Sequence, residues 1–111
     1  MLRESQTAVI ARNERWAGTA ATEPYEAGWA SEAVLFVRAL ARAKGKPGRA
    51  RVEISPDGMR WVAEGTTFPL PTKADGVTCA RIRHFGNWLR ITASLPKGAE
   101  LTVLVTYHLK A

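Results

Sequence analysis

Apolar and polar residues alternate along most of the chain, most regularly near its C-terminal end. In residues 100–109, apolar side chains occupy every odd position, whereas threonine, leucine and histidine occupy the even positions between them. Because successive side chains of a strand point to opposite faces, this pattern predicts a half-buried β-strand. Residues 87–95 alternate in the same way, and the turn-forming Pro96-Lys97-Gly98 separates the two segments. Together they predict a hairpin.

A second hairpin is predicted in the middle of the chain. Residues 49–55 and residues 59–65 both alternate, which puts Trp61 on the core side of the second segment. Between them lies Ser55-Pro56-Asp57-Gly58, in which proline presets φ for a turn and glycine accepts a positive φ. This interpretation makes the Trp61 ring a plug of the core.

Two neighbouring segments extend the strand pattern. Residues 77–84 alternate and predict a strand that ends at the turn Phe85-Gly86-Asn87. Residues 66–72 contain Pro69 and Pro71, neither of which can donate a ladder hydrogen bond. We therefore expect residues 66–72 to be an edge or crossover segment.

Residues 32–44 fit either a strand or a helix. As a helix, this segment has a capping Ser31, a high alanine content and a terminating Gly45. However, the four consecutive apolar residues 34–37 would surround a helix axis, and every neighbouring segment predicts a strand. We therefore favour a strand.

The first thirty residues are less regular. Residues 7–12 and 16–22 are typical of short strands, and residues 24–28 of a loop. We expect residues 1–30 to form an N-terminal segment that packs on the domain or on a neighbouring subunit. Residues 31–111 then form the core of a single domain.

The segments together number about seven to eight short strands separated by turns, which indicates an all-β fold. We predict an antiparallel, jelly-roll-like β-sandwich with an irregular N-terminal segment.

The order of the motifs is similar to that of small jelly-roll proteins. An apolar strand is followed by a basic loop, a Ser-Pro-Asp-Gly-x-x-Trp hairpin, a Trp-Leu-Arg-Ile strand and an apolar closing strand, at residues 33–43, 44–48, 55–61, 88–91 and 101–107. In this layout the chain resembles jelly-roll structural proteins of phages and prophages of the decoration type, and more weakly carbohydrate-binding and discoidin-like modules. The first resemblance implies a role on a virion head or tail, and the second implies glycan binding.

Composition limits the compartments and the classes of partner that we expect for the protein. The chain has 111 residues, with 16 Lys and Arg against 10 Asp and Glu, a net charge of +6 that permits but does not require a polyanionic partner. The single cysteine excludes an internal disulfide and fits a reducing compartment. Neither a membrane-spanning apolar run nor a secretory signal is evident, so we expect a cytoplasmic or virion location and no membrane partner.

Residues able to do chemistry are few and scattered. The two histidines, His84 and His108, lie in predicted strands, and Cys79 is opposite in parity to His84. A metal site or a thiol nucleophile would need these groups to converge with a carboxylate. We expect no catalytic residues, no metal, no cofactor and no enzymatic activity.

Arginines gather on the outward side of the predicted strands. They are Arg49, Arg51, Arg81, Arg83 and Arg90, joined by Arg38 and Arg42 if residues 32–44 form a strand. If these strands share a sheet, one face carries a basic surface. That surface is either solvated and paired with Glu53 and Glu64, or it binds an acidic partner such as a capsid surface or nucleic acid.

Aromatic residues supply the candidates for contact with a partner. Trp16, Tyr25 and Trp29 lie in the N-terminal segment, and Trp88 lies on the outward side of its strand, where it is exposed or packs under a loop. Their large apolar rings must be buried, either against the chain's own sandwich or against a neighbouring subunit. Stacking on a sugar is a further possibility.

The leading hypothesis is therefore a non-enzymatic structural protein. It would self-assemble as a homo-oligomer or dock on a larger protein assembly such as a virion, since association covers exposed sheet edges. The alternatives are a carbohydrate-binding module and a sheet that binds nucleic acid through its arginines.

Overall fold

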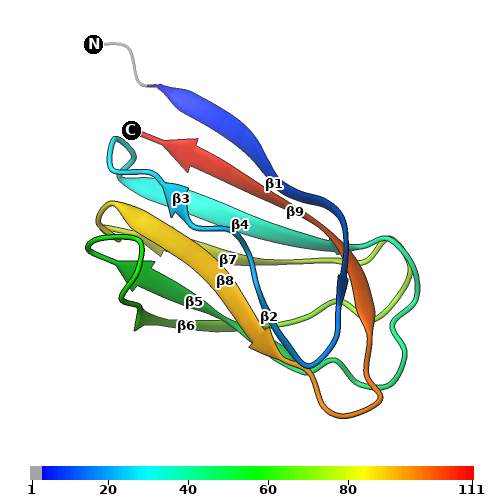
Figure 1. Ribbon diagram of the computed structural model, residues 1–111. Helices are drawn as coiled ribbons and strands as arrows, with labels where there is room; N and C mark the ends of the chain where they lie inside the picture. The colour runs from blue at the N-terminus through cyan, green and yellow to red at the C-terminus, as the bar shows by residue number, and fades with distance from the viewer. Residues whose placement is uncertain (1–3) are drawn as a thin grey trace.

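The computed structural model describes residues 4–111, which form nine strands and no helix (Figure 1). The strands are β1 (Ser5–Trp16), β2 (Thr19–Ala21), β3 (Tyr25–Glu26), β4 (Glu32–Ala39), β5 (Arg49–Ser55), β6 (Val62–Pro69), β7 (Val77–Arg83), β8 (Trp88–Ser94) and β9 (Leu101–Lys110). No helix capable of crossing a membrane occurs in these residues.

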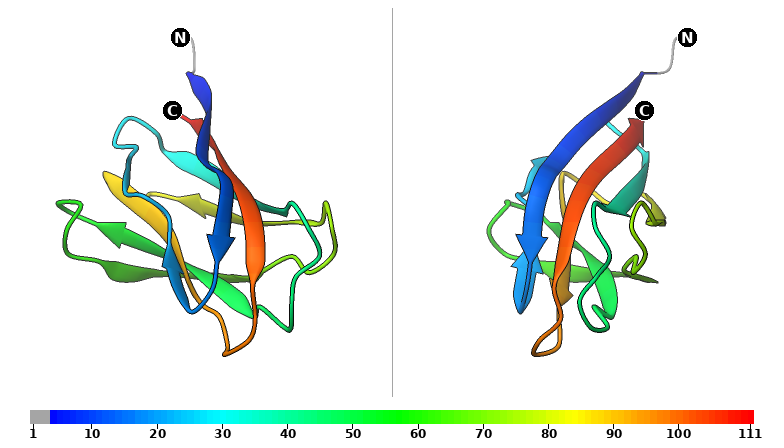
Figure 2. Two further views of the ribbon diagram at one scale, coloured as in Figure 1. Left: turned by 45° about the vertical axis from the view of Figure 1, so that its right-hand side comes forward. Right: turned by 90° about the vertical axis from the view of Figure 1, so that its right-hand side faces the viewer.

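The strands form two antiparallel sheets packed face to face (Figures 1 and 2). Sheet A has the order β1-β9-β4-β7, and sheet B has the order β2-β8-β5-β6, with β3 also paired to β8. β2 and β3 pair with successive parts of β8, so they act as one interrupted strand. Every connection crosses between the sheets except β2–β3 and β5–β6, which is the winding of a jelly roll. The predicted jelly-roll-like sandwich is confirmed.

The core lies between the two sheets and is built from the inward side of each alternating strand. The largest fully buried side chains are Trp16, Tyr107, Leu35, Leu89, Ile91, Leu101 and Leu109. β9 is the clearest case, because its burial alternates residue by residue along the whole strand. The alternation of residues 100–109 therefore identified the correct inward positions.

The predicted strand over residues 32–44 is confirmed in its first part. β4 lies between β9 and β7, with Leu35 and Val37 fully buried on its inner side. It ends at Ala39. The Ala39 carbonyl accepts a hydrogen bond from the Asp75 N–H (2.8 Å), and the Ala39 N–H donates to the Gly76 carbonyl (2.9 Å). Arg42 consequently lies in the following loop and not in a strand.

The second predicted hairpin is correct in β5 and wrong in the register of β6. β6 begins at Val62 instead of residue 59, because the turn occupies the residues up to Trp61. Met59 is consequently 75% exposed, and Trp61 is half-buried instead of being a core plug. β6 is an edge strand of sheet B that continues to Pro69, as the prolines of this segment predicted.

The N-terminal residues are more regular than the sequence suggests. β1 extends over 12 residues and pairs with β9, with register shifts between Val9 and Glu14. The predicted loop at residues 24–28 contains the short strand β3. Residues 5–26 thus contribute strands to both sheets of the same sandwich.

Candidate protein-docking surface

The arginines do not form one basic face. Arg38, Arg81 and Arg83 lie on the outer side of sheet A, on β4 and β7. Those on the outer side of sheet B are Arg49, Arg51 and Arg90. The condition for a single arginine surface, that all of these strands share a sheet, is therefore not met. Alternation decides whether a side chain points inward or outward, but it does not decide which sheet its strand joins.

Carboxylates of the chain pair with several of these arginines. Glu53 is 2.7 Å from Arg90 and 3.5 Å from Arg51, and Arg38 is 2.7 Å from Asp75. The predicted pairing with Glu53 is thus present on sheet B. The Trp61 ring lies 4.2 Å from the Arg90 guanidinium carbon, so it covers this ion pair from outside the core.

The four aromatic candidates for partner contact have different environments. Trp16 is 1% exposed, and its indole N–H donates to Glu14 (3.1 Å), so its prediction as a partner contact is wrong. Tyr25 is half-buried and packs edge-on against Tyr107, with ring centroids 5.8 Å apart. Trp29 is 38% exposed.

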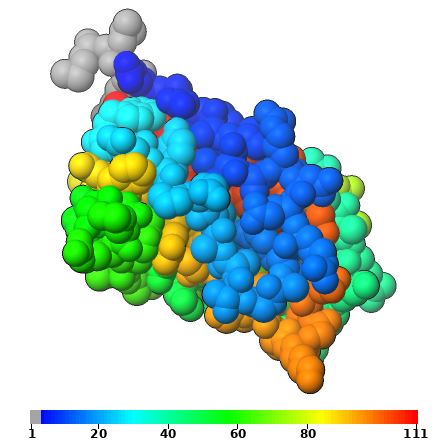
Figure 3. Space-filling model, viewed as in Figure 1, coloured from blue at the N-terminus to red at the C-terminus, as the bar shows by residue number. Residues whose placement is uncertain are grey.

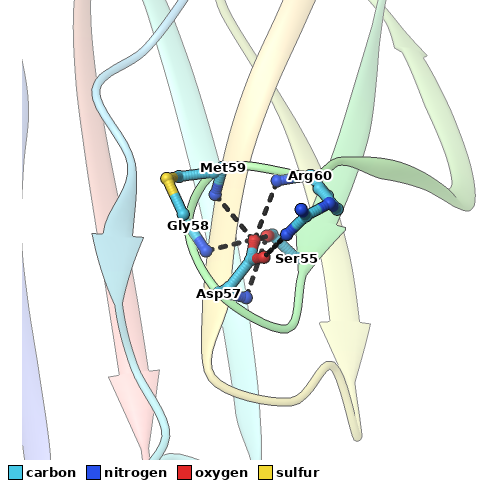
Figure 4. A network of polar contacts seen from close by, with 5 residues as sticks. All are labelled: Ser55, Asp57, Gly58, Met59 and Arg60. Carbon is cyan, nitrogen blue, oxygen red and sulfur yellow. Dashed lines mark hydrogen bonds and ion pairs between the residues drawn. The ribbon is translucent and has the colours of Figure 1, made fainter.

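Trp88 packs under a loop, one of the two possibilities foreseen. A Cβ at Gly58 would lie 3.3 Å from the Trp88 ring, so the turn after β5 rests on it. In that turn, Asp57 Oδ1 accepts the N–H groups of Met59 (2.9 Å) and Arg60 (2.8 Å) (Figure 4). These backbone donors, that of Arg60 first, lower the pKa of Asp57 from 3.8 to about 2.

A buried polar bridge joins the two sheets beside Tyr25. The Thr22 hydroxyl lies 3.0 Å from the Tyr107 hydroxyl and accepts the Ile91 N–H at 2.9 Å. The Thr22 N–H also donates to the Ile91 carbonyl (2.9 Å), so Thr22 continues the pairing with β8 between β2 and β3. Burial raises the pKa of Tyr107 far above its usual 10.0, so its hydroxyl stays protonated.

The side chains with potential for catalysis or metal binding remain dispersed. His84 lies in the bend after β7 with a φ of 54°, not within a strand as predicted. His108 lies on the outer side of sheet A, where its ring is 4.8 Å from that of Phe36. Cys79 is directly opposite Phe36 in the neighbouring strand. Within residues 4–111, no group of three or more His, Cys, Asp or Glu side chains could hold a metal ion.

The outer side of sheet A carries an apolar strip. We use this name for the outward residues Val9, Val34, Phe36, Val77, Cys79 and Leu104. Thr106 lies between Val9 and Phe36, and Arg38 lies between Leu104 and Val77, so the strip is interrupted at these two positions. Val9 is 43% exposed and Val77 is 54% exposed, whereas Val34, Phe36 and Leu104 are half-buried. The outer side of a sandwich strand is usually polar, so this strip is an unusual feature of the surface.

A shallow groove of about 580 Å³ lies at one end of the strip. Its floor includes Val34 and Phe36, and its borders carry Arg81, Arg83 and Lys110 together with the acidic Glu32 and Glu64. A second hollow, of about 440 Å³, opens at the end of the sandwich beside Ile54, Val62 and Phe85. Charges of both signs around an apolar floor can contact a protein surface of mixed charge.

The strip was missed at the level of sequence, although a signal was present. The outward positions of β4 and β9 hold Val34, Phe36 and Leu104, where alternation alone would place polar residues. A central strand with apolar residues on both sides reads as a continuous apolar run, as residues 34–37 do.

Comparison with known proteins relates the fold but gives no family. Neither protein-family models nor curated protein sequences match this chain. Among solved structures, the SPBc2 prophage-derived protein YomS aligns with 100% of this chain and 96% of its own, at a TM-score of 0.61 and 8% identity. This likeness shows a shared fold. A structure of infectious bursal disease virus, Gx strain, aligns with 97% of this chain and 32% of that chain, with 12% identity and a TM-score of 0.46, too low to relate the two.

Proposed function

We propose that this chain is a non-enzymatic structural protein that associates with further copies of itself in an assembly of the virion type. The observation that carries the proposal is the apolar strip on the outer side of sheet A. Its partly exposed valines and Phe36 form an apolar surface on a sheet that the core does not require to be apolar on that side. Contact with another subunit would remove that surface from water.

The surroundings of the strip support a protein partner. Arg81, Arg83 and Lys110 lie near Glu32 and Glu64 at the groove, so the surface offers both charges around an apolar centre. This is the arrangement of a protein interface, with an apolar core and a polar rim. The likeness to a prophage-derived protein over nearly its full length supports the virion type. Such a protein would assemble in the host cytoplasm and be carried in the virion.

The two alternatives have less support. The nucleic-acid hypothesis depended on one arginine face, and the arginines are divided between opposite sides of the molecule. The carbohydrate hypothesis depended on exposed aromatic rings, of which Trp16 is buried and Tyr25 packs on Tyr107.

Sedimentation velocity over a wide range of concentration tests the proposal. The wild-type chain is expected to sediment as species larger than a monomer, in proportions that rise with concentration. Val77→Lys places a charge in the apolar strip and is expected to weaken this association by about tenfold or more, because the ammonium group would have to leave water.

Val62→Lys is the matched control. Val62 is 58% exposed, similar to Val77, but it lies on β6 of sheet B. It is expected to leave the association unchanged. A wild-type chain that remains a monomer at every concentration would refute self-association, and equal effects of the two lysine variants would refute the role of the strip.

A further inference from the structure

The first half of β1 forms an open edge of sheet A. β9 lies on one side of it, where Ser5 pairs with Lys110 and Val9 with Thr106, and no other described strand pairs with β1. Figures 1 and 2 show this half of β1 projecting along the margin of the molecule. In Figure 3 its blue atoms form the upper margin of the surface. The edge is therefore accessible to another strand.

This edge lacks the usual protection against pairing. Charged residues, prolines and bulges protect edge strands. β1 has such features in its second half, where Arg12, Glu14 and Arg15 lie and where the register shifts occur. Residues 5–10 read Ser-Gln-Thr-Ala-Val-Ile, without a charge or a proline. An uncharged, regular edge of this length is a template for a further strand.

The other sheet edges are protected. β7 carries Arg81 and Arg83, and β6 contains Gly65 at a φ of 114° and ends in Pro69. β2 and β3 are only 3 and 2 residues long. Among the described sheet edges, the first half of β1 therefore differs from the others in lacking such protection.

The hydrogen bonds to β9 determine which backbone groups of β1 are free. The Ala111 N–H donates to the Glu4 carbonyl at 2.9 Å, so these two residues form a hydrogen-bonded pair. Such pairs alternate with non-bonded pairs along an antiparallel ladder. The even residues of this half therefore bond to β9. The N–H and C=O groups of Ser5, Thr7 and Val9 point to the open side.

We propose that two copies of this chain pair through these edges, antiparallel, about a two-fold axis at Thr7. The axis is perpendicular to the sheet, so each side chain stays on its own face and opposed residues share parity. Thr7 then lies opposite the partner's Thr7, and Ser5 lies opposite the partner's Val9. These residues form three pairs, each of which exchanges two N–H···O bonds.

The register at Thr7 makes the fullest use of the open edge. An axis at Val9 would extend the pairing over the register shift that follows this residue. With the axis at Thr7, all three pairs lie in the regular half of β1. Sheet A has four strands in each copy, so the dimer contains one continuous sheet of eight strands. This inference rests on the proposed function and identifies the contact that joins the first two copies.

Site-directed crosslinking tests the register. In a Cys79→Ala background, which removes the native thiol and keeps the apolar strip apolar, Thr7→Cys places two thiols directly opposite one another across the axis. A short bifunctional thiol-alkylating reagent is expected to convert most of the protein to a covalent dimer. Val9→Cys in the same background is the control, because the two thiols are then roughly 13 Å apart along the strands. It is expected to yield little dimer.

A proline substitution tests the backbone pairing without relying on thiols. Thr7→Pro removes an N–H that points to the open side, so the ladder with β9 is retained and the variant is expected to unfold at nearly the wild-type temperature. Its self-association is expected to be weaker by roughly tenfold or more, because the central pair loses both of its donors.

Thr67→Pro is the matched control on β6, the edge of sheet B. The Leu70 N–H donates to the Gly48 carbonyl (2.9 Å), so by the same alternation the Thr67 N–H points outward. This variant is expected to associate like the wild type.

The outcomes separate this inference from the proposed function. The edge pairing is supported if covalent dimer forms through a cysteine at position 7 but not at position 9, and if Thr7→Pro weakens self-association whereas Thr67→Pro does not. Association that Val77→Lys weakens but Thr7→Pro does not would overturn the edge pairing and leave the proposed function standing. Crosslinking at position 9 instead of position 7 would overturn the register. A wild-type monomer at all concentrations would overturn both proposals.

Discussion

Trp16 and Trp61 carry the same side chain in opposite environments. Trp16 ends β1 and is almost completely buried between the sheets, whereas Trp61 precedes β6 and lies over Arg90 on the outside. From the sequence, Trp61 was expected in the core, because its parity was counted through a turn that is longer than assumed. Trp16 was expected to be buried either against its own sandwich or against a neighbouring subunit. For Trp16, the irregular pattern around it concealed that β1 continues as far as this residue.

The two tryptophans should therefore differ in their contribution to stability. Trp16→Ala is expected to lower the free energy of unfolding by about 3–5 kcal/mol, since it leaves a large cavity in the core. Trp61→Ala should cost about 1 kcal/mol, mainly the lost contact with the guanidinium group. Urea denaturation followed by circular dichroism measures both. Comparable losses in the two variants would contradict this assignment.

The Thr22–Tyr107 bridge gives a second comparison between residues. Tyr107→Phe removes one hydroxyl but leaves Thr22 bonded to Ile91, so it is expected to cost about 1 kcal/mol. Thr22→Val removes the hydroxyl that bonds to both the Tyr107 hydroxyl and the Ile91 N–H, so two buried hydrogen bonds are lost and it should cost about 2 kcal/mol. The same denaturation experiment applies. A larger loss for Tyr107→Phe would show that the hydroxyl has another role.

At the scale of the element, the turn after β5 is held by one carboxylate. Asp57 accepts from two backbone N–H groups and lies 2.7 Å from Arg60, while the Ser55 hydroxyl accepts the Gly58 N–H at 2.8 Å. This network keeps the turn over Trp88. Because it uses residues as far as Arg60, β6 begins only at Val62.

The lowered pKa of Asp57 makes the contribution of this turn dependent on pH. A carboxyl whose pKa falls on folding, here from 3.8 to about 2, stabilises the fold fully above its unfolded value. That stabilisation is lost as the pH falls through about 2. Asp57→Ala is therefore expected to lower the melting temperature at neutral pH, and the difference from wild type should narrow progressively below about pH 4.

Asp57→Asn serves as the control in this pH series. It retains a side-chain oxygen that can accept from Met59 and Arg60 but has no titrating charge. Its melting temperature should lie between those of the wild type and Asp57→Ala at neutral pH. A difference between wild type and Asp57→Ala that stays constant down to pH 2 would contradict the assignment.

At the scale of the whole molecule, local alternation predicted the strands but not their partners. β8 and β9 were correctly assigned as strands, yet they lie in different sheets and do not form the predicted hairpin. A short turn between two alternating segments is compatible with either arrangement. The choice depends on long-range pairing, such as that of β9 with β1 and β4, which local patterns do not contain.

The candidate site shows the same limit. The outward direction of Arg81 and Arg83 could be predicted from alternation, but not their separation from Arg49 and Arg51 on the other sheet. The apolar strip combines residues from β1, β4, β7 and β9, which become neighbours only when sheet A forms. Its members are visible in the sequence, but their adjacency is not.

The pairing of β1 with β9 has a mechanical consequence. Ser5 lies opposite Lys110, so the start of β1 and the end of β9 lie at the same end of the ladder. A force that pulls these two ends apart therefore acts on both strands from that end. Tension applied across these ends would open the hydrogen bonds one after another, like a zipper, instead of loading them all together in shear. In a subunit tethered through both of these ends, β1 would therefore separate from β9 at low force. A subunit held through the outer sides of its sheets would not load this ladder in the same way.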